Sequence, residues 1–323
     1  MYLCPEGEEL AIAEAAAGFL ADAMPIARLH ATDSADLAPA LRRSFGDMGW
    51  FALAVPESAG GSGLSAVEHA LFFREAGRQC GPLDLLAQCL AANTASSAQT
   101  RSALISGEAA AALLVPDNGA WRVLGSPAAT LGLLVERGSA SLHALPAAGI
   151  TRRSALSPAN SISLLDQLPP VSEGCDGARI WQLGQLGAAA MLVGLAEAAL
   201  DMIVDYAKVR ETFGRKIGAW QAVRHPCADM AVRAEAARSQ LWFAAAAIKE
   251  GRGDAQVHLD AAKLAAGRAA QENADANIQL HGGIGVTDEH NAHLLLKQAM
   301  VVSRLFGGKR ALLAALLHAE VED

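Results

Sequence analysis

Apolar residues recur every three to four positions over the first hundred residues of the chain, which is the spacing of one buried face of an α-helix. The pattern begins at Glu8 and continues to about Ser106. Within it, Ser65 precedes an apolar run and Glu68 follows three residues later, which is the signature of a capping box at a helix N-terminus. The first part of the chain is therefore predicted to be helical, with helices over 36–48, 66–80 and 82–96.

The same spacing returns after residue 177, in longer stretches. One of them is closed by Gly251 and Gly253, as helix C-termini commonly are. Long helices with short connections are typical of a helical bundle. The predicted helices cover 178–209, 220–250, 254 or 260 to 280, and 291–305.

Between these two regions, short apolar runs alternate with turn residues such as Asp117-Asn118-Gly119 and Gly125-Ser126-Pro127. That alternation predicts a small antiparallel β unit with few strands. The sequence therefore predicts a mostly α protein with a small β domain. Its three domains are an N-terminal helical domain over 1–108, a short antiparallel β domain over 109–176 and a C-terminal four-helix bundle over 177–323.

The composition supports a helical core and excludes one class of partner. Of the 323 residues, 52% are hydrophobic but only 5% are aromatic, so the core must be built mainly from Ala, Leu, Val and Ile. Ala and Leu favour helices. A formal net charge of -8 and an isoelectric point near 5.6 argue against general nucleic-acid binding, which needs a basic surface.

The cysteines and the N-terminus predict a cytoplasmic protein without a membrane span. None of the cysteines forms a CxxC pair, so reduced thiols are expected rather than a zinc site or disulfides. The N-terminus lacks the basic stretch of a signal peptide. Gln185 and Glu197 interrupt the apolar run over 183–200, which therefore predicts a buried core helix. The cysteines are Cys4, Cys80, Cys89, Cys175 and Cys227.

Two polar motifs follow the ends of predicted long helices: Arg210-Glu-Thr-Phe-Gly-Arg-Lys-Ile-Gly218 and Gln279-Leu-His-Gly-Gly-Ile-Gly285. Each joins a hydrogen-bonding side chain to glycines that let a backbone approach a ligand closely. The Arg fork also suits phosphate oxygens, so the motifs predict a site for a phosphate-bearing cofactor. The alternatives are a solvated Arg at a helix C-terminus and an ordinary Gly C-cap. His281 is expected to be packed or solvated rather than a base.

These motifs and the order of the domains resemble the acyl-CoA dehydrogenase family. The resemblance covers nearly the whole chain, is strongest from 188 to 308, and includes the VPESAGGSGL segment over 55–64, which is similar to the family's VPExxGGSGL. It implies FAD as the cofactor and the α,β-desaturation of an acyl-CoA thioester as the reaction. In that family the β domain of one subunit holds the flavin ring, and a neighbouring subunit's bundle holds the nucleotide end.

The resemblance assigns roles to the motif residues. It implies that Arg210 pairs with the pyrophosphate and that Phe213 packs on the adenine side. The nucleotide would also be held by Gln221, Gln279, Gly282 and Gly283.

The chain departs from the family where the catalytic parts are expected. The usual catalytic Glu falls at Phe306, and the alternative base position falls near Gly184 and Gln185, so no catalytic residue is assigned. The middle domain also lacks the family's T-E-P-x-x-G-S-D loop and W-[IV]-[ST]-N strand, which contact the flavin. A positioned carboxylate contributes on the order of 10²–10⁴-fold to abstraction of the weakly acidic α-proton.

The resulting hypothesis is a division of labour. The chain resembles the non-catalytic subunit of a heteromeric α2β2 bacterial acyl-CoA dehydrogenase of the steroid side-chain-degrading type. A catalytic partner subunit would supply the Glu, the flavin clamp and the acyl-CoA site, and the isolated chain would be inactive. The alternatives are a flavin-free structural pseudoenzyme and a flavoenzyme of altered chemistry on the same fold.

Overall fold

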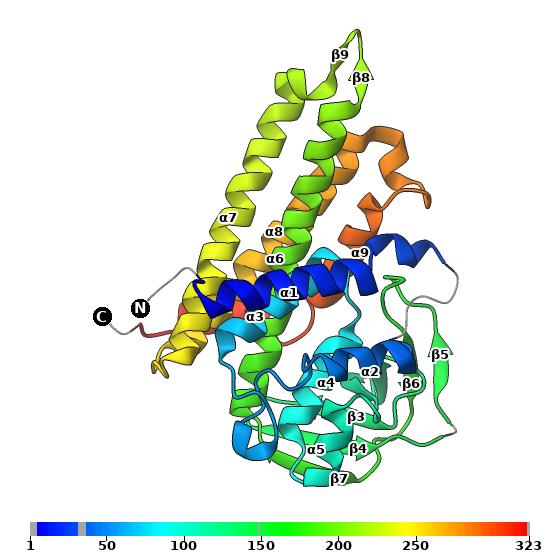
Figure 1. Ribbon diagram of the computed structural model, residues 1–323, viewed down its shortest axis with the longest axis vertical. Coiled ribbons are helices and arrows are strands. Elements are labelled where there is room, and N and C mark those ends of the chain that lie inside the picture. Colours follow the sequence, from blue (N-terminus) through cyan, green and yellow to red (C-terminus); the bar gives the residue numbers. More distant parts are fainter. Residues whose placement is uncertain (1–4, 32–36, 148, 322–323) are drawn as a thin grey trace. The chain divides into compact units, whose positions relative to one another are not determined.

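The computed structural model describes residues 5–31, 37–147 and 149–321 and divides the chain into two compact units (Figure 1). The first unit comprises Met1–His30, Ala70–Cys80 and Gln185–Asp323, and the second comprises Ala31–His69 and Gly81–Gly184. Helices precede a central sheet and helices follow it, so the predicted fold class is confirmed. The three domain boundaries drawn from the sequence remain a prediction.

Helices form the N-terminal part of the chain up to residue 105. The helix predicted over 36–48 begins at Pro39, whose fixed φ suits the first helical turn; residue 36 lies outside the described residues. The capping box forms as predicted, because Glu68 Oε2 accepts the Ser65 backbone N–H at 2.9 Å. The elements are α1 (Glu8–Ala23), η1 (Ile26–His30), α2 (Pro39–Asp47), η2 (Glu57–Ala59), α3 (Ala66–Arg78), α4 (Leu83–Thr94) and α5 (Ala98–Ile105).

The sheet of the second unit has seven strands in the order β5-β6-β2-β1-β3-β4-β7. The prediction of few, purely antiparallel strands differs in two respects. The strands are only three to seven residues long, so more of them fit into the segment. In addition, β3 pairs with β1 in parallel, because the chain crosses the start of β1 after the β1–β2 hairpin. The strands are β1 (Ala111–Asp117), β2 (Ala120–Leu124), β3 (Leu131–Val135), β4 (Ser139–Ala144), β5 (Thr151–Arg153), β6 (Ile162–Leu165) and β7 (Val171–Asp176).

The four predicted C-terminal helices match their ranges to within a few residues, because their apolar spacing is a local signal. The short helix over 309–317 was not predicted. A two-stranded hairpin and a short 3-10 helix connect α6 to α7, and Figure 1 shows this hairpin beyond the ends of both helices. The elements are α6 (Ala178–Val209), β8 (Glu211–Thr212), β9 (Arg215–Lys216), η3 (Ile217–Ala219), α7 (Gln221–Lys249), α8 (Ala255–His281), η4 (Gly282–Val286), α9 (Ala292–Val302) and α10 (Lys309–Leu317).

Two glycines let α3 and α6 approach each other closely in the first unit. A Cβ at Gly194 of α6 would lie 2.0 Å from the carbonyl oxygen of Arg74, and a Cβ at Gly77 of α3 would lie 2.1 Å from that of Met191. Both distances are far below any van der Waals contact, so each helix requires glycine where it crosses the other.

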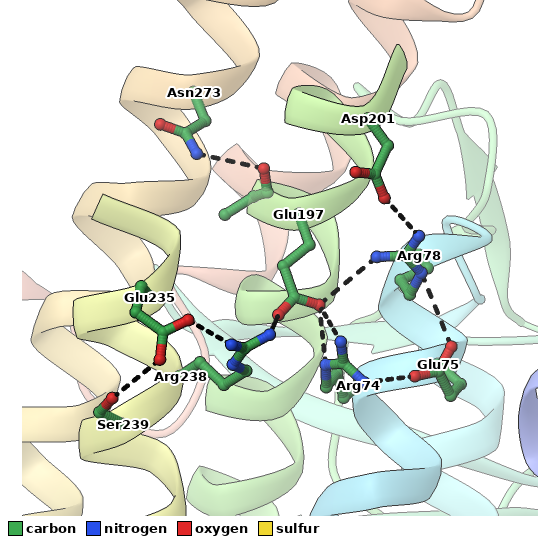
Figure 2. Close-up of polar contacts among 10 residues, drawn as sticks. Arg74, Glu75, Arg78, Glu197, Asp201, Glu235, Arg238, Ser239 and Asn273 are labelled. Atoms are coloured by element: carbon green, nitrogen blue, oxygen red, sulfur yellow. Dashed lines mark hydrogen bonds and ion pairs between the residues drawn. The ribbon is translucent and has the colours of Figure 1, made fainter. Parts of the chain in front are cut away.

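A buried ion-pair network ties α3, α6 and α7 together beside this crossing (Figure 2). Glu197 of α6 is 7% exposed and accepts from Arg74 Nε at 2.7 Å. Arg78 and Arg238 reach the same carboxylate at 3.5 and 3.4 Å, from α3 and α7 respectively. Three cations from two helices therefore converge on one carboxylate of a third helix.

Asn273 supplies a second polar link among the long helices (Figure 2). It is fully buried on α8 and donates its two amide hydrogens to the carbonyl oxygens of Ala196 at 3.1 Å and Met230 at 3.0 Å. Its Oδ1 accepts from Arg233 Nε at 2.9 Å. Because every group of this amide is paired, Asn273 fixes the relative register of α6, α7 and α8.

Among the residues that the structure describes, two segments are long and apolar enough to cross a membrane by length and composition alone: Glu8–His30 and Ala178–Val209. In the second, which is α6, 72% of the most apolar window is buried inside the protein. This burial agrees with the predicted role of α6 as a core helix. In Glu8–His30 only 17% of the corresponding window is buried.

Candidate functional site

The first polar motif folds into a tight hairpin directly after α6. The backbone N–H of Ile217 donates to the Arg210 carbonyl at 2.8 Å, and Lys216 pairs with Glu211 at 2.7 Å across the two strands. Phe213 and Gly214 form the turn, with φ of 51° and 72°. A two-residue turn with positive φ at both positions matches the twist of a β-hairpin, and Gly214 adopts it at no steric cost.

The hairpin leaves its candidate binding side chains exposed. Within residues 5–31, 37–147 and 149–321, the side chains of Arg210 and Gln221 make no hydrogen bond or ion pair. Phe213 is 95% exposed at the turn, and Gln221 is the first residue of α7. Side chains that contribute so little to this chain's own packing are available to a ligand.

The second motif occupies the end of α8 and the turn of η4. Gly282 is the C-cap of α8, with φ 68° and ψ -148°, a conformation that is essentially restricted to glycine. A Cβ at Gly282 or Gly283 would meet nothing within 4 Å, so the space beside both glycines is open. Gln279 is exposed, and its side chain makes no hydrogen bond to the part of the chain that the structure describes. The helix C-cap and the open approach to a ligand are therefore both present.

An aromatic contact brings the two motifs together. Tyr206 lies one turn before Arg210 on α6, and its carbonyl accepts the Arg210 backbone N–H at 2.9 Å. The Tyr206 ring packs on the His281 ring at the end of α8, with 4.5 Å between centroids. His281 is 5% exposed, as expected for a packed residue rather than a base. Arg210 and Gln279 thus belong to neighbouring helix ends in the first unit.

Sequence reasoning did not identify Tyr206 as part of this site. Its position four residues before Arg210 on the same helix was the available signal, because residues spaced by four lie on one helix face. The His281 ring as its contact could not be read from the sequence, since 75 residues separate the two positions.

Phe306, where the sequence analysis places the family's catalytic Glu, lies in the turn after α9 with φ of 51°. Lys263 of α8 holds this end of α9, donating to the carbonyl oxygens of Val302 at 3.3 Å and Ser303 at 3.2 Å. Burial lowers the pKa of Lys263 to about 7. Phe306 itself has no group that can accept a proton.

A carboxylate does lie beside the alternative base position, which the sequence analysis did not find. Gln185 Nε2 donates to Asp260 Oδ1 of α8 at 2.7 Å, and Gln256 Nε2 donates to the same oxygen at 3.0 Å. Asp260 was considered only as a possible helix start, but α8 begins at Ala255 and Asp260 is buried within it. These bonds commit Asp260 to a buried network.

The second unit has short loops where the family's flavin-contacting loop is expected. Only Asn118 and Gly119 separate β1 from β2, with φ of 48° and 90°. A hydrogen bond joins the link from β2 to β3 to α4, because the Ser126 backbone N–H donates to Asp84 Oδ1 at 2.6 Å.

The small residues Ala188 to Ala190 on α6, which could have left room for a substrate, are fully buried.

Two family models match the chain. Residues 6–104 match the acyl-CoA dehydrogenase N-terminal domain, and residues 181–321 match the acyl-CoA dehydrogenase C-terminal domain. The chain belongs to the acyl-CoA dehydrogenase family, whose members are flavoprotein oxidoreductases with FAD as the family cofactor.

Two curated relatives come from Mycobacterium tuberculosis. The chain is 33% identical to the acyl-CoA dehydrogenase IpdE2 over 280 residues, which is 83% of this chain and 82% of that protein. It is 34% identical to the acyl-CoA dehydrogenase FadE34 over 281 residues, which is 81% of this chain but only 39% of that protein.

Solved structures share the fold. A variant of the steroid ACAD Tcur3481–Tcur3483 matches with a TM-score of 0.80 and 25% identity, covering 96% of each chain. The ChsE4–ChsE5 complex of Mycobacterium tuberculosis matches with a TM-score of 0.78 and 21% identity, covering 97% of each chain.

Proposed function

We propose that this chain is the non-catalytic subunit of a heteromeric acyl-CoA dehydrogenase and that it contributes the nucleotide-end half of an FAD site to a catalytic partner. The observation that carries the proposal is a contrast within the chain. The residues assigned to the nucleotide end are exposed and make no side-chain bonds within the described residues, whereas the catalytic position is Phe306.

The residues at the helix ends fit the nucleotide part of FAD. The guanidinium of Arg210 would pair with the pyrophosphate, and the open backbone at Gly282 and Gly283 would let the nucleotide approach. Gln221 and Gln279 carry amide groups that can donate to and accept from the nucleotide. Phe213 would pack on the adenine side. Its side chain is 95% exposed, and burying an exposed aromatic ring against a planar base lowers the free energy of binding.

The flavin ring and the base are assigned to the partner. When bound, FAD accepts the hydride from the β-carbon of the acyl-CoA thioester. The two-residue turn at Asn118 and Gly119 leaves this chain without a loop of the length that the family uses against the ring. A catalytic Glu of the partner subunit would take the α-proton, because Phe306 cannot. An α2β2 assembly with half the usual number of flavin sites follows.

The comparisons favour such a pairing. Tcur3481–Tcur3483 and ChsE4–ChsE5 are each named as a pair of chains, and the first is named a steroid ACAD. We therefore infer a bulky, steroid-like acyl group for the heteromer, which the partner binds. From the scattered cysteines without a CxxC pair we also propose a cytoplasmic location.

The proposal is tested by purifying the chain alone and with an acyl-CoA-dehydrogenase-like partner that carries the Glu and the flavin loop. We expect no bound FAD and no turnover from the chain alone, and one FAD per pair of subunits from the complex. Stoichiometric FAD together with dehydrogenase turnover from the isolated chain would refute it.

The Arg210→Ala variant separates a half-site from a scaffold. Removing a charge-assisted phosphate contact should weaken FAD retention by the complex about tenfold or more. The matched control is Arg310→Ala, which removes an equally exposed Arg from α10 and should retain FAD. Unchanged FAD retention in the Arg210→Ala complex would favour the flavin-free pseudoenzyme instead.

A further inference from the structure

The Tyr206–His281 contact joins the two parts of the proposed half-site. This contact depends on the protonation state of the His281 ring. We infer that His281 is a positioning residue that holds the end of α6 against the η4 turn only while its ring is neutral, so that the half-site opens in acid. The identity of the ligand rests on the proposed function, but the opening itself belongs to this chain alone.

The hydrogen bonds of His281 define its tautomer. Nδ1 lies 2.7 Å from the carbonyl oxygen of Asn277, which can only accept, so Nδ1 carries the hydrogen. Nε2 is then an unprotonated nitrogen. It is buried, and it has no hydrogen-bond partner within the described part of the chain. A second proton would therefore have to be placed on a buried atom with nothing to accept its hydrogen bond.

The His281 ring also contacts another histidine. The His281 and His290 rings lie 4.4 Å apart between centroids, and His290 Nδ1 accepts the Ala292 backbone N–H at 3.1 Å. Nearby on α9, both ring nitrogens of His293 are buried without a hydrogen-bond partner among residues that the structure describes. His281 and His290 each therefore have a ring nitrogen that carries no hydrogen, and His293 has no partner for a ring hydrogen within the described residues.

The charges around this histidine cluster (His281, His290 and His293) oppose a further proton. Lys297 of α9 adds positive charge beside it, and a proton on His30 of η1 would add more. The carboxylate that faces it, Asp288, lies 3.9 Å from His293 and is fully exposed, so water screens its attraction. Tyr206 is the titratable group of α6 whose ring contacts His281.

Burial lowers the pKa of all three histidines of the cluster. For His290 the neighbouring His281, His293 and His30 lower it further, and for His293 so do Lys297 and His30. A histidine whose pKa is lowered in the closed state stabilises that state when the pH lies above the ordinary histidine pKa of about 6.5. This stabilisation is lost as the pH falls below about 6.5. For each proton taken up on opening, the population of the open state rises by up to about tenfold for every unit by which the pH falls.

A protonated histidine would attract the phosphates of a nucleotide, which could oppose this effect. The geometry decides between the two. The nitrogen that takes the proton is buried, and its ring packs against Tyr206 and His290, so it cannot present its charge to a ligand unless the ring contacts open first. Opening separates Arg210 from the Gly282 turn, and the half-site is lost with it.

Hydrogen exchange of the isolated chain tests the opening without any cofactor. Backbone amides over 279–290, corrected for intrinsic exchange rates, should open at least about tenfold more often at pH 5.5 than at pH 7.5. Amides of β1 to β4 in the second unit serve as the reference. Equal opening at both pH values would overturn the inference.

Two variants assign the effect to His281. His281→Phe keeps a ring against Tyr206 but cannot take a proton, so the pH dependence of opening should flatten by about one proton, or tenfold per pH unit. His225→Phe alters an exposed histidine of α7 and should behave as the wild type. A His281→Phe chain as acid-sensitive as the wild type would contradict the assignment.

Direct titration of the wild-type His281 ring by NMR keeps the inference testable if His281→Phe does not fold. The ring should titrate below its ordinary value, and titration at or above about 6.5 would refute the positioning role. In the complex, FAD retention should fall over the same pH range. If the segment opens in acid while FAD retention stays constant, the proposed half-site is wrong and the positioning role of His281 stands.

Discussion

The middle of α6 and the residue that follows its end place arginine side chains in opposite environments. Around Glu197, three guanidiniums converge on one buried carboxylate (Figure 2). Thirteen residues further along, Arg210 is exposed and its side chain makes no bond to any other described residue. A paired and buried charge holds helices together, whereas an unpaired charge at a helix end contributes little to stability and suits a ligand. The contrast separates what maintains this fold from what the fold presents to a partner.

The largest effect is expected at the helix crossing beside Glu197. Gly194→Val would force side-chain atoms against the Arg74 carbonyl, where even a Cβ would lie at 2.0 Å. Overpacking against backbone of this kind should reduce the free energy of unfolding by at least about 3 kcal/mol. Thermal or urea unfolding measures it.

The control for Gly194 is Gly18→Ala, which alters an exposed helical glycine of α1 with nothing within 4 Å of its added Cβ. It should leave stability unchanged or raise it by about 0.5–1 kcal/mol. If Gly194→Val were as stable as this control, α3 and α6 would not cross as closely as described.

The next largest effect concerns the network itself. Glu197→Gln removes the buried carboxylate that three arginines share, although each arginine is partly exposed and keeps another carboxylate, so it should cost about 1–3 kcal/mol of unfolding free energy. Lys208→Gln breaks the exposed Lys208–Asp205 pair and should cost less than about 0.5 kcal/mol. Equal losses in the two variants would remove the distinction between buried and exposed charge on α6.

A smaller effect should appear as a pH dependence. Burial lowers the pKa of Lys263 to about 7, so between pH 7 and 8.5 the unfolded chain binds more protons there than the folded chain. Stability should therefore rise with pH across this window, by about 1–2 kcal/mol from this residue. Lys263→Met should lose that rise in denaturant unfolding measured at both pH values. A rise of equal size in the variant would assign it to another group.

The smallest effect on stability is expected at the exposed hairpin that carries Arg210. Arg210→Ala and Phe213→Ser should each change the free energy of unfolding by less than about 0.5 kcal/mol, because both side chains are exposed and that of Arg210 makes no bond within the described residues. Denaturant unfolding of the isolated chain measures this. A loss of several kcal/mol would mean that the hairpin stabilises the fold, which would weaken the case for a ligand there.

The helices were predictable because their signal is local. The 3.6-residue apolar period placed α6 at its observed bounds and placed α7 to within a residue at each end. The sheet was less accurately predicted, since strands of three to seven residues carry few repeats of the period-2 pattern. The parallel pairing of β1 with β3 depends on a crossover that no local pattern encodes.

The candidate site divides in the same way. Gly282 adopts a backbone conformation that glycine alone permits, so this part can be read from a short segment. The hairpin turn of the Arg210 motif was not predicted, because Phe213 takes a positive φ that a bulky residue rarely adopts. The carboxylate beside Gln185 could not be read in this way, because Asp260 arrives from a helix 75 residues away.

The sequence by itself determined the helices, the two polar motifs and the absence of a carboxylate at Phe306, because each depends on residue type and spacing along the chain. Only the tertiary structure decided which charges are paired, that Tyr206 meets His281, and that one histidine nitrogen is buried without a partner among the described residues. The physical reason is that burial and pairing are properties of packing between segments distant in sequence, and these properties set the energy of every polar group.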